Sequence, residues 1–285
     1  MTKLLSANFL RLWKNKTFWV SAIICVASGV LAPLGEFRAV VSMNGRVTDL
    51  GELGNLALLE VFFGYASFIG ILAGAFISLF LGTEYSDGTI RNKVMAGHSR
   101  VAIYFANLIV GFTASLVCMA AYMASCLAVG APLLGWFSKP ASLILTTIFG
   151  SALMLAAFCA IFTFVTMNVS RKSTSVVICL LGVFIMLFLA IYLYARLDEP
   201  EFIQDYSFSV GGEILPMEPE PNPQYLRGME RKVYQFIFDL LPTGQSIQYN
   251  GLIFTDPVRL MVMSLALFVG FSGAGAALFR RKDLK

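Results

Sequence analysis

Long apolar runs alternate with short polar segments along the whole chain. A helix needs roughly 20 predominantly apolar residues to cross about 30 Å of hydrocarbon. Six runs have about this length, at residues 17–35, 57–82, 101–130, 141–169, 174–195 and 258–279. The pattern therefore predicts an all-α membrane protein with six transmembrane helices in a single domain that spans residues 1–285.

The composition agrees with this pattern and adds little chemistry. Of the 285 residues, 58% are hydrophobic and only 13% are charged, which excludes a water-soluble globular domain. The five cysteines all fall inside apolar runs without a CxxC spacing, and His98 has no partner at metal-ligand spacing. We therefore expect buried apolar thiols and no metal site.

The basic residues predict the orientation, because cytoplasmic loops carry an excess of Lys and Arg. If the N-terminus is cytoplasmic, that side receives thirteen of the 21 basic residues and only three of the 17 acidic ones. The thirteen are Lys3, Arg11, Lys14, Lys16, Arg91, Lys93, Arg100, Arg171, Lys172, Arg280, Arg281, Lys282 and Lys285. Both termini are therefore expected in the cytoplasm.

The first 16 residues allow two interpretations. A basic segment ahead of an apolar run is typical of a cleaved signal peptide. However, Leu5, Phe9, Leu12 and Trp13 share one face of a helix. We favour an uncleaved amphipathic helix at residues 1–16 that lies on the cytoplasmic membrane surface.

The segment between the fifth and sixth runs, residues 196–257, is predicted to form a small outer subdomain. It carries four basic and ten acidic residues, as the positive-inside rule leads us to expect. Its first half is rich in proline, which favours extended chain, whereas residues 224–241 have helical periodicity that ends at Pro242. We expect a helix and a partial helix at the outer interface. A second, shorter outer loop is expected near residues 36–55.

The sequence contains no recognisable catalytic centre. The middle of each apolar run lacks ionisable residues, so a proton relay or an intramembrane hydrolase is disfavoured. No Gly-x-x-x-x-Gly-Lys-[Ser/Thr] motif occurs, so the chain cannot hold nucleotide phosphates in a P-loop. We expect the chain not to be an enzyme.

Two runs carry patterned faces that allow two interpretations. Small residues on a stripe permit close packing of helices, and they also suit the wall of a substrate path. The candidate path residues are Phe63, Ser67, Gly70, Gly74 and Ser78 in the second run, with Cys179 and Met186 in the fifth. Gly270, Gly273 and Gly275 of the sixth run indicate tight packing only.

The polar island, residues 83–100, separates the second and third runs and has an ordered plan. Glu84 lies where the second run ends, Asp87-Gly88 predicts a turn, and residues 89–95 predict a short helix. Ser99 then has the character of an N-cap for the third run. Such an ordered segment is suited to binding a partner.

The motif Glu84-x-x-x-Gly88-Thr89-Ile90-Arg91, followed by Ser99-Arg100, resembles the cytoplasmic loop of ABC-2 type permeases, the membrane subunits of ATP-binding-cassette exporters. The amphipathic start, the six runs and Leu241-Pro242-Thr243-Gly244 before the sixth run resemble the same plan. Gly97-His98 and Asn107 depart from it where family members often have a Pro and a Lys.

The resemblance implies that the polar island is a coupling helix that docks on a separate ATPase subunit. The implied partner-binding residues are Glu84, Gly88, Thr89, Ile90, Arg91, Lys93 and Val94. ATP and Mg²⁺ would be bound by that ATPase, and no cofactor is expected in this chain. A second permease copy, identical or related, would complete the transporter, with the second and fifth helices along the path and residues 225–250 over its exit.

These inferences lead to one expected function and one alternative. The chain is expected to be the permease subunit of an exporter that moves an amphipathic or hydrophobic cargo, such as a peptide, an antibiotic or a lipid-like molecule, by alternating access. We expect it in the bacterial plasma membrane, in contact with lipid and without nucleic-acid partners. The alternative is a membrane sensor or scaffold whose polar island binds a cytoplasmic partner without transport.

Overall fold

The computed structural model describes residues 1–42, 50–169, 171–203, 206–208, 214–216, 220–254 and 256–282. The helices are α1 (Thr2–Trp13), α2 (Lys16–Ser42), α3 (Leu50–Phe63), α4 (Ala66–Ser86), α5 (Thr89–Met95), α6 (Arg100–Leu134), α7 (Ala141–Asn168), α8 (Lys172–Asp198), α9 (Gly228–Leu240), α10 (Pro242–Gly251) and α11 (Pro257–Arg281). Two antiparallel strand pairs join β1 (Phe202–Ile203) to β4 (Glu220–Pro221) and β2 (Tyr206–Phe208) to β3 (Ile214–Pro216).

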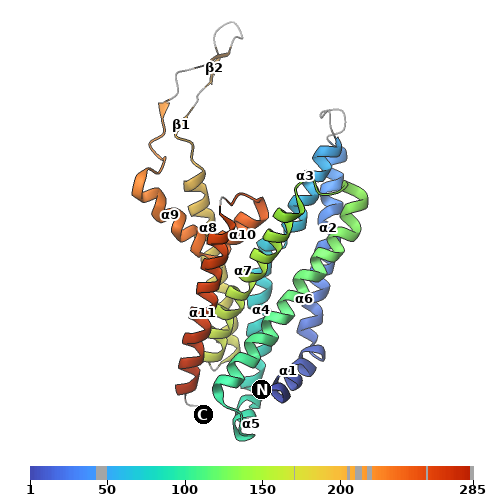
Figure 1. Ribbon diagram of the computed structural model, residues 1–285, viewed down its shortest axis with the longest axis vertical. Helices are drawn as coiled ribbons and strands as arrows, with labels where there is room; N and C mark the ends of the chain where they lie inside the picture. The colour runs from blue at the N-terminus through green and yellow to red at the C-terminus, as the bar shows by residue number, and fades with distance from the viewer. Residues whose placement is uncertain are drawn as a thin grey trace.

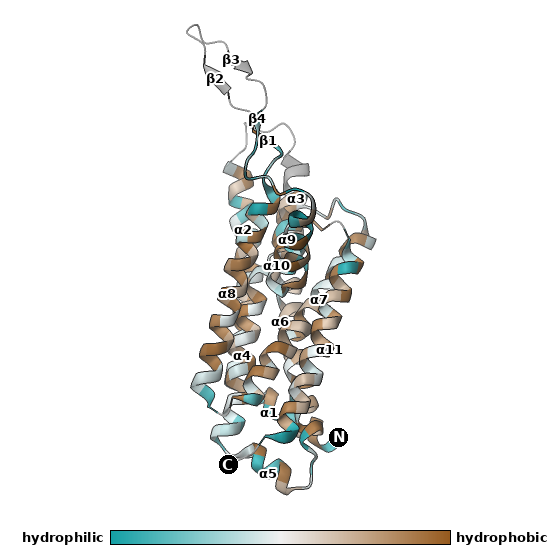
Figure 2. Cartoon of the chain, turned by 90° about the vertical axis from the view of Figure 1, so that its left-hand side faces the viewer, coloured by the Kyte–Doolittle hydropathy of each residue, from teal (hydrophilic) through white to brown (hydrophobic). Residues whose placement is uncertain are grey.

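The helices form an elongated bundle in which α5 and both termini lie at the same end (Figure 1). Among the described residues, six helical segments are long and apolar enough to cross a membrane, which confirms the six predicted spans. Apolar residues colour the middle of the long helices, whereas hydrophilic residues gather towards the two ends of the bundle (Figure 2). Placing both termini at one end agrees with an even number of spans.

The first span is longer than the run predicted at residues 17–35. α2 continues through the buried Pro33 to Ser42, so most of the loop expected near residues 36–55 is helical. Residues 43–49 of that range lie outside the described residues. A Cβ added at Gly130 of α6 would lie 3.3 Å from Cβ of Pro33, so α2 and α6 pack closely at this point.

The second span is broken into two helices, whereas one continuous helix is predicted at residues 57–82. α3 ends at Phe63 and α4 begins at Ala66, with Gly64 and Tyr65 between them. The carbonyl oxygen of Val61 accepts hydrogen bonds from the Gly64 amide, at 3.1 Å, and from the Tyr122 hydroxyl, at 2.7 Å. Tyr122 of α6 therefore satisfies a backbone acceptor at the end of α3.

The segment between α8 and α11 contains the extended chain and the helix that were predicted. α9 provides the helix, and the short strands provide the extended part within the described residues. The expected partial helix is α10, which starts with Pro242 at its first turn and packs against α7, α8 and α4 inside the bundle. Its Gln245 is fully buried, donates to the Asp239 carbonyl at 2.8 Å and accepts from the Ser264 hydroxyl at 2.5 Å.

Candidate functional site

The polar island has the local structure that its sequence predicts. Gly88 adopts a left-handed conformation, with φ of 67°, between α4 and α5, and Gly97 does so after α5, with φ of 84°. The Ser99 side chain then caps α6 by accepting from the Ala102 amide at 3.2 Å. The seven-residue α5 is therefore set between two glycine turns, at the tip of the bundle.

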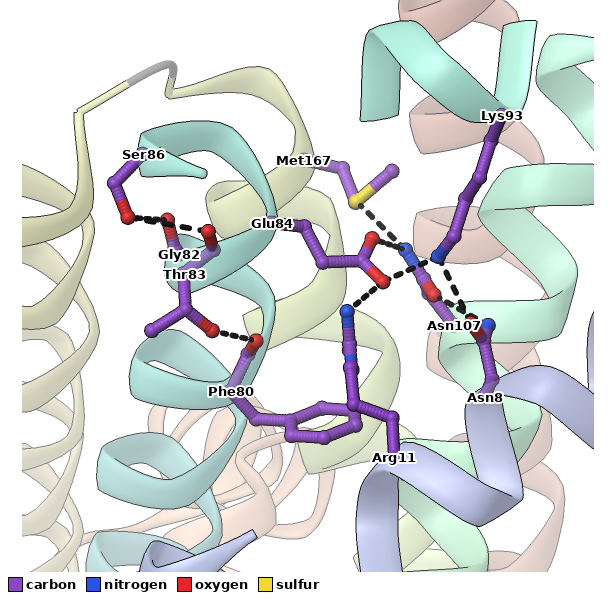
Figure 3. Close-up of polar contacts among 10 residues, drawn as sticks. All are labelled: Asn8, Arg11, Phe80, Gly82, Thr83, Glu84, Ser86, Lys93, Asn107 and Met167. Atoms are coloured by element: carbon purple, nitrogen blue, oxygen red, sulfur yellow. Dashed lines mark hydrogen bonds and ion pairs between the residues drawn. The ribbon is translucent and has the colours of Figure 1, made fainter. Parts of the chain in front are cut away.

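Glu84 is the centre of this end of the molecule. Its side chain is completely buried, with an exposed fraction of 0%, and its carboxylate forms ion pairs with both Arg11 and Lys93 (Figure 3). The amide nitrogen of Asn107 donates to the second carboxylate oxygen at 2.8 Å. The carboxylate is thus satisfied by side chains from α1, α5 and α6.

Asn8 closes these contacts into one network. Its amide oxygen accepts from Lys93 Nζ at 2.8 Å, and its amide nitrogen donates to Asn107 Oδ1 at 2.8 Å. The Arg11 guanidinium also lies 3.9 Å from the centre of the Phe80 ring, in cation–π geometry. We call Asn8, Arg11, Glu84, Lys93 and Asn107 the Glu84 network.

The electrostatics of the Glu84 network favour keeping it intact. Burial lowers the pKa of Lys93 and of Arg11, while the attraction of Glu84 opposes that change in both. Removing one member of a buried ion pair leaves an uncompensated charge, which costs about 3–5 kcal/mol. The network therefore ties α5 firmly to α1, α4 and α6.

The predicted partner-binding residues divide between two faces of α5. Ile90 is 1% exposed and Lys93 points into the Glu84 network, so both face the bundle and not a partner. Val94 packs partly buried against the core, on the same face. Arg91 is exposed, as are Asn92 and Met95, the last with 77% of its surface accessible. The exposed face of α5 is therefore formed by Arg91, Asn92 and Met95, and Lys93 lies on the face towards the bundle.

Three members of the Glu84 network are not among the site residues predicted from the sequence. Asn8 and Arg11 lie on the helix predicted to rest on the membrane surface, and Asn107 was noted only as a departure from the family pattern. The available signal was Asn8, which occupies a buried helical stripe with Leu4 and Leu12. A polar residue within an apolar stripe indicates a specific partner.

The same end of the bundle is held by a second group of contacts around Lys282, which follows α11. Lys282 Nζ donates to the carbonyl oxygens of Met167, at 3.0 Å, and Asn168, at 2.9 Å, at the end of α7. The Tyr85 hydroxyl of α4 donates to the Met167 carbonyl as well, and Arg100 donates to the carbonyls of Arg280 and Lys282. The ends of α4, α6, α7 and α11 are therefore joined where α5 attaches.

The candidate path residues are mostly used in packing within the chain. A Cβ at Gly70 would lie 2.8 Å from the Phe158 ring, and one at Gly74 would lie 3.2 Å from the Phe162 ring. The Ser78 hydroxyl is bonded to the Gly74 carbonyl at 2.6 Å. Phe63 and Cys179 are buried, Ser67 is exposed, and the Met186 carbonyl accepts from the Thr243 hydroxyl at 2.7 Å. Close packing of α4 on α7 accounts for the two glycines, and a role in a path stays a prediction for the other residues.

Comparison with known families agrees with this architecture. Residues 4–187, from α1 through most of α8, match the model of a family described as ABC-2 family transporter protein. A comparison with curated proteins gives no match. The matched region contains the polar island and all five members of the Glu84 network. Because the match covers more than half of the chain, this protein belongs to the ABC-2 family of transporter proteins.

Proposed function

We propose that the chain is the permease subunit of an ATP-driven exporter and that α5 is its docking element for a separate ATPase subunit. The observation that carries this proposal is the attachment of α5 by a buried ionic network to helices that continue into the membrane. A surface loop with no mechanical role does not need a fully buried carboxylate behind it. The end of the bundle with α5 and both termini then faces the cytoplasm.

Force applied to α5 reaches three other helices through the Glu84 network. Lys93 of α5 contacts Glu84 of α4 and Asn8 of α1, and Asn107 of α6 contacts both of these. The ATPase binds ATP and Mg²⁺, and its closure displaces α5 as a body. The network passes this displacement to α1, α4 and α6, which biases the membrane helices between two arrangements by alternating access.

The apolar outer surface supports assembly with a second permease copy in a lipid membrane. Ile23 and Leu31 of α2 and Ile185 and Phe188 of α8 are each more than 60% exposed. Exposed apolar side chains of this size are stable against lipid or a partner helix, not against water. We place the first and fifth spans at the contact between two copies. The membrane is a bacterial plasma membrane in this proposal, and the cargo is amphipathic.

Co-purification with an ATPase tests this function. The full chain from native membranes should bring with it a Walker-motif ATPase, and Arg91→Glu should reduce that association at least tenfold by reversing charge on the docking face. Lys139→Glu, at an exposed position before α7, is the matched control and should change nothing. Recovery of a partner without ATPase activity would instead favour a sensor or scaffold.

A further inference from the structure

A cavity of about 390 Å³ lies in the half of the bundle opposite α5. It forms where α3 and α4 break apart and where α2, α6 and α10 converge on the gap. Its lining residues are Ser28, Ala32, Glu36, Glu60, Val61, Gly64, Phe68, Tyr122 and Asn250. A Cβ added at Gly64 would lie 3.2 Å from the Tyr122 hydroxyl, so the glycine at the break keeps this space open.

Among the polar groups that line the cavity, hydrogen-bond acceptors outnumber hydrogen-bond donors. Glu36 and Glu60 line it, no Lys or Arg of the described chain does, and neither carboxylate forms an ion pair with another described residue. Asn250 also lines the cavity, but its amide oxygen is buried beneath the wall, where it accepts no hydrogen bond from the described residues. The Tyr122 hydroxyl is not a free donor to the cavity, because it donates its proton to the Val61 carbonyl at 2.7 Å.

Apart from Ser28, the remaining wall is apolar and aromatic. The rings of Phe68 and Tyr122 pack edge to face, with centroids 5.6 Å apart. Val61 and Ala32 complete this side. A ligand that suits the whole cavity therefore has a positively charged group with several N–H donors and a compact apolar body.

We propose that this cavity binds a primary ammonium group carried on a compact aromatic or aliphatic body. Glu36 and Glu60 balance the charge and accept hydrogen bonds from the ammonium group, and Phe68 and Tyr122 contact the body. A divalent cation is a poorer occupant, because the described residues contain no group of three His, Cys, Asp or Glu side chains able to hold one. Calling this ligand the cargo rests on the proposed exporter function, whereas the binding itself does not.

Calorimetric titration of the full chain in zwitterionic lipid nanodiscs tests the proposal, with empty nanodiscs as the baseline. The probe is 2-phenylethylammonium, and its matched analogue is 2-phenylethanol, which keeps the body and lacks the charge. We expect saturable binding of the ammonium at least tenfold tighter than that of the alcohol. The N,N,N-trimethyl analogue, which keeps the charge but has no N–H donors, should bind about fivefold more weakly than the primary ammonium.

Variants locate the binding. Glu36→Gln and Glu60→Gln keep the shape of the side chain and should each weaken binding about tenfold, and the double variant should abolish it. Glu230→Gln removes one negative charge from exposed α9 and should leave affinity unchanged. Equal binding of the alcohol, full affinity in the double variant, no saturable binding, or displacement of the probe by Ca²⁺ or Mg²⁺ at equal concentration would each overturn the proposal.

The same titration separates this proposal from the exporter function. Saturable binding of the ammonium without any associated ATPase would keep the cavity and remove the exporter. An active ATPase complex that does not bind the ammonium would support the exporter function and overturn the proposal for the cavity.

Discussion

Glu84 shows how one residue can join four helices. A carboxylate with no exposed surface is stable only when its partners replace the water it has lost, and Arg11, Lys93 and Asn107 do so. Arg11 retains 28% of its side-chain exposure and Lys93 only 12%. Lys93 is therefore the cation that depends more strongly on Glu84.

Glu84→Gln should lower the free energy of unfolding by about 3 kcal/mol, because it leaves Lys93 buried without a counter-charge. Thermal unfolding of the purified chain measures this loss. Asp87→Asn removes a charge three residues away on an exposed side chain and should stay within about 0.5 kcal/mol of the original protein.

The double variant Glu84→Gln with Lys93→Met tests whether the two residues act as a pair. Removing both charges also removes the uncompensated cation, so the double variant should be less destabilised than the sum of the two single variants by about 1–3 kcal/mol. Additive losses would show that the two side chains contribute independently and would remove the ionic link from α4 to α5.

At the scale of elements, α5 depends on its glycine turn more than on its own length. A helix of seven residues is too short to be stable alone, so its direction is set by Gly88 and by the contacts of Ile90 and Lys93. A Cβ at Gly88 would meet nothing within 4 Å. The constraint at this position is therefore conformational and not steric.

Gly88→Ala should cost about 1 kcal/mol and displace α5, because an alanine at φ of 67° is strained. Association with the ATPase should fall with it. Gly88→Asn should retain more of that association, since asparagine tolerates the left-handed region better than alanine. Equal association of the two variants would mean that the turn does not orient α5.

The contact of α4 with α7 depends on glycines in the same direct way. Gly70→Ala should destabilise the chain by about 1–3 kcal/mol, because the new methyl group would overlap the Phe158 ring. Gly273→Ala is the matched control on α11, where a Cβ would meet nothing within 4 Å, and its unfolding temperature should not fall. Of the three α11 glycines for which tight packing is predicted, Gly275 packs closely within the described chain, against Tyr104, whereas a Cβ at Gly270 or Gly273 would meet nothing within 4 Å.

For the whole molecule, the sequence predicted what depends on local pattern and missed what depends on distant contacts. Apolar runs predict spans because each run must match the membrane by itself. The Glu84 network joins residues up to 99 positions apart, such as Asn8 and Asn107, and no periodicity brings them together. The break at Gly64 was missed for the same reason, since it depends on a hydroxyl from α6 that satisfies a carbonyl of α3.

The proposed function requires both ends of the bundle to move together, and α4 spans the distance between them. Glu84 lies near one end of α4 and the break at Gly64 borders the cavity at the other. A cysteine introduced at Ser28, in a chain whose five buried native cysteines are replaced by serine, should react with a membrane-impermeant thiol reagent added outside. Trapping the ATPase in its closed state should change that rate at least threefold, and Glu84→Gln should abolish the change.

A cysteine at Ser138 provides the reference for this labelling, because Ser138 is exposed beyond the end of α6 and does not line the cavity. Its rate should be the same in both nucleotide states and in the Glu84→Gln variant. Labelling of Ser28→Cys from the inside alone would reverse the proposed orientation. If the labelling rate of Ser28→Cys is the same in both nucleotide states, α4 does not carry the motion of α5 to the cavity. The coupling would then have to run through α1 or α6.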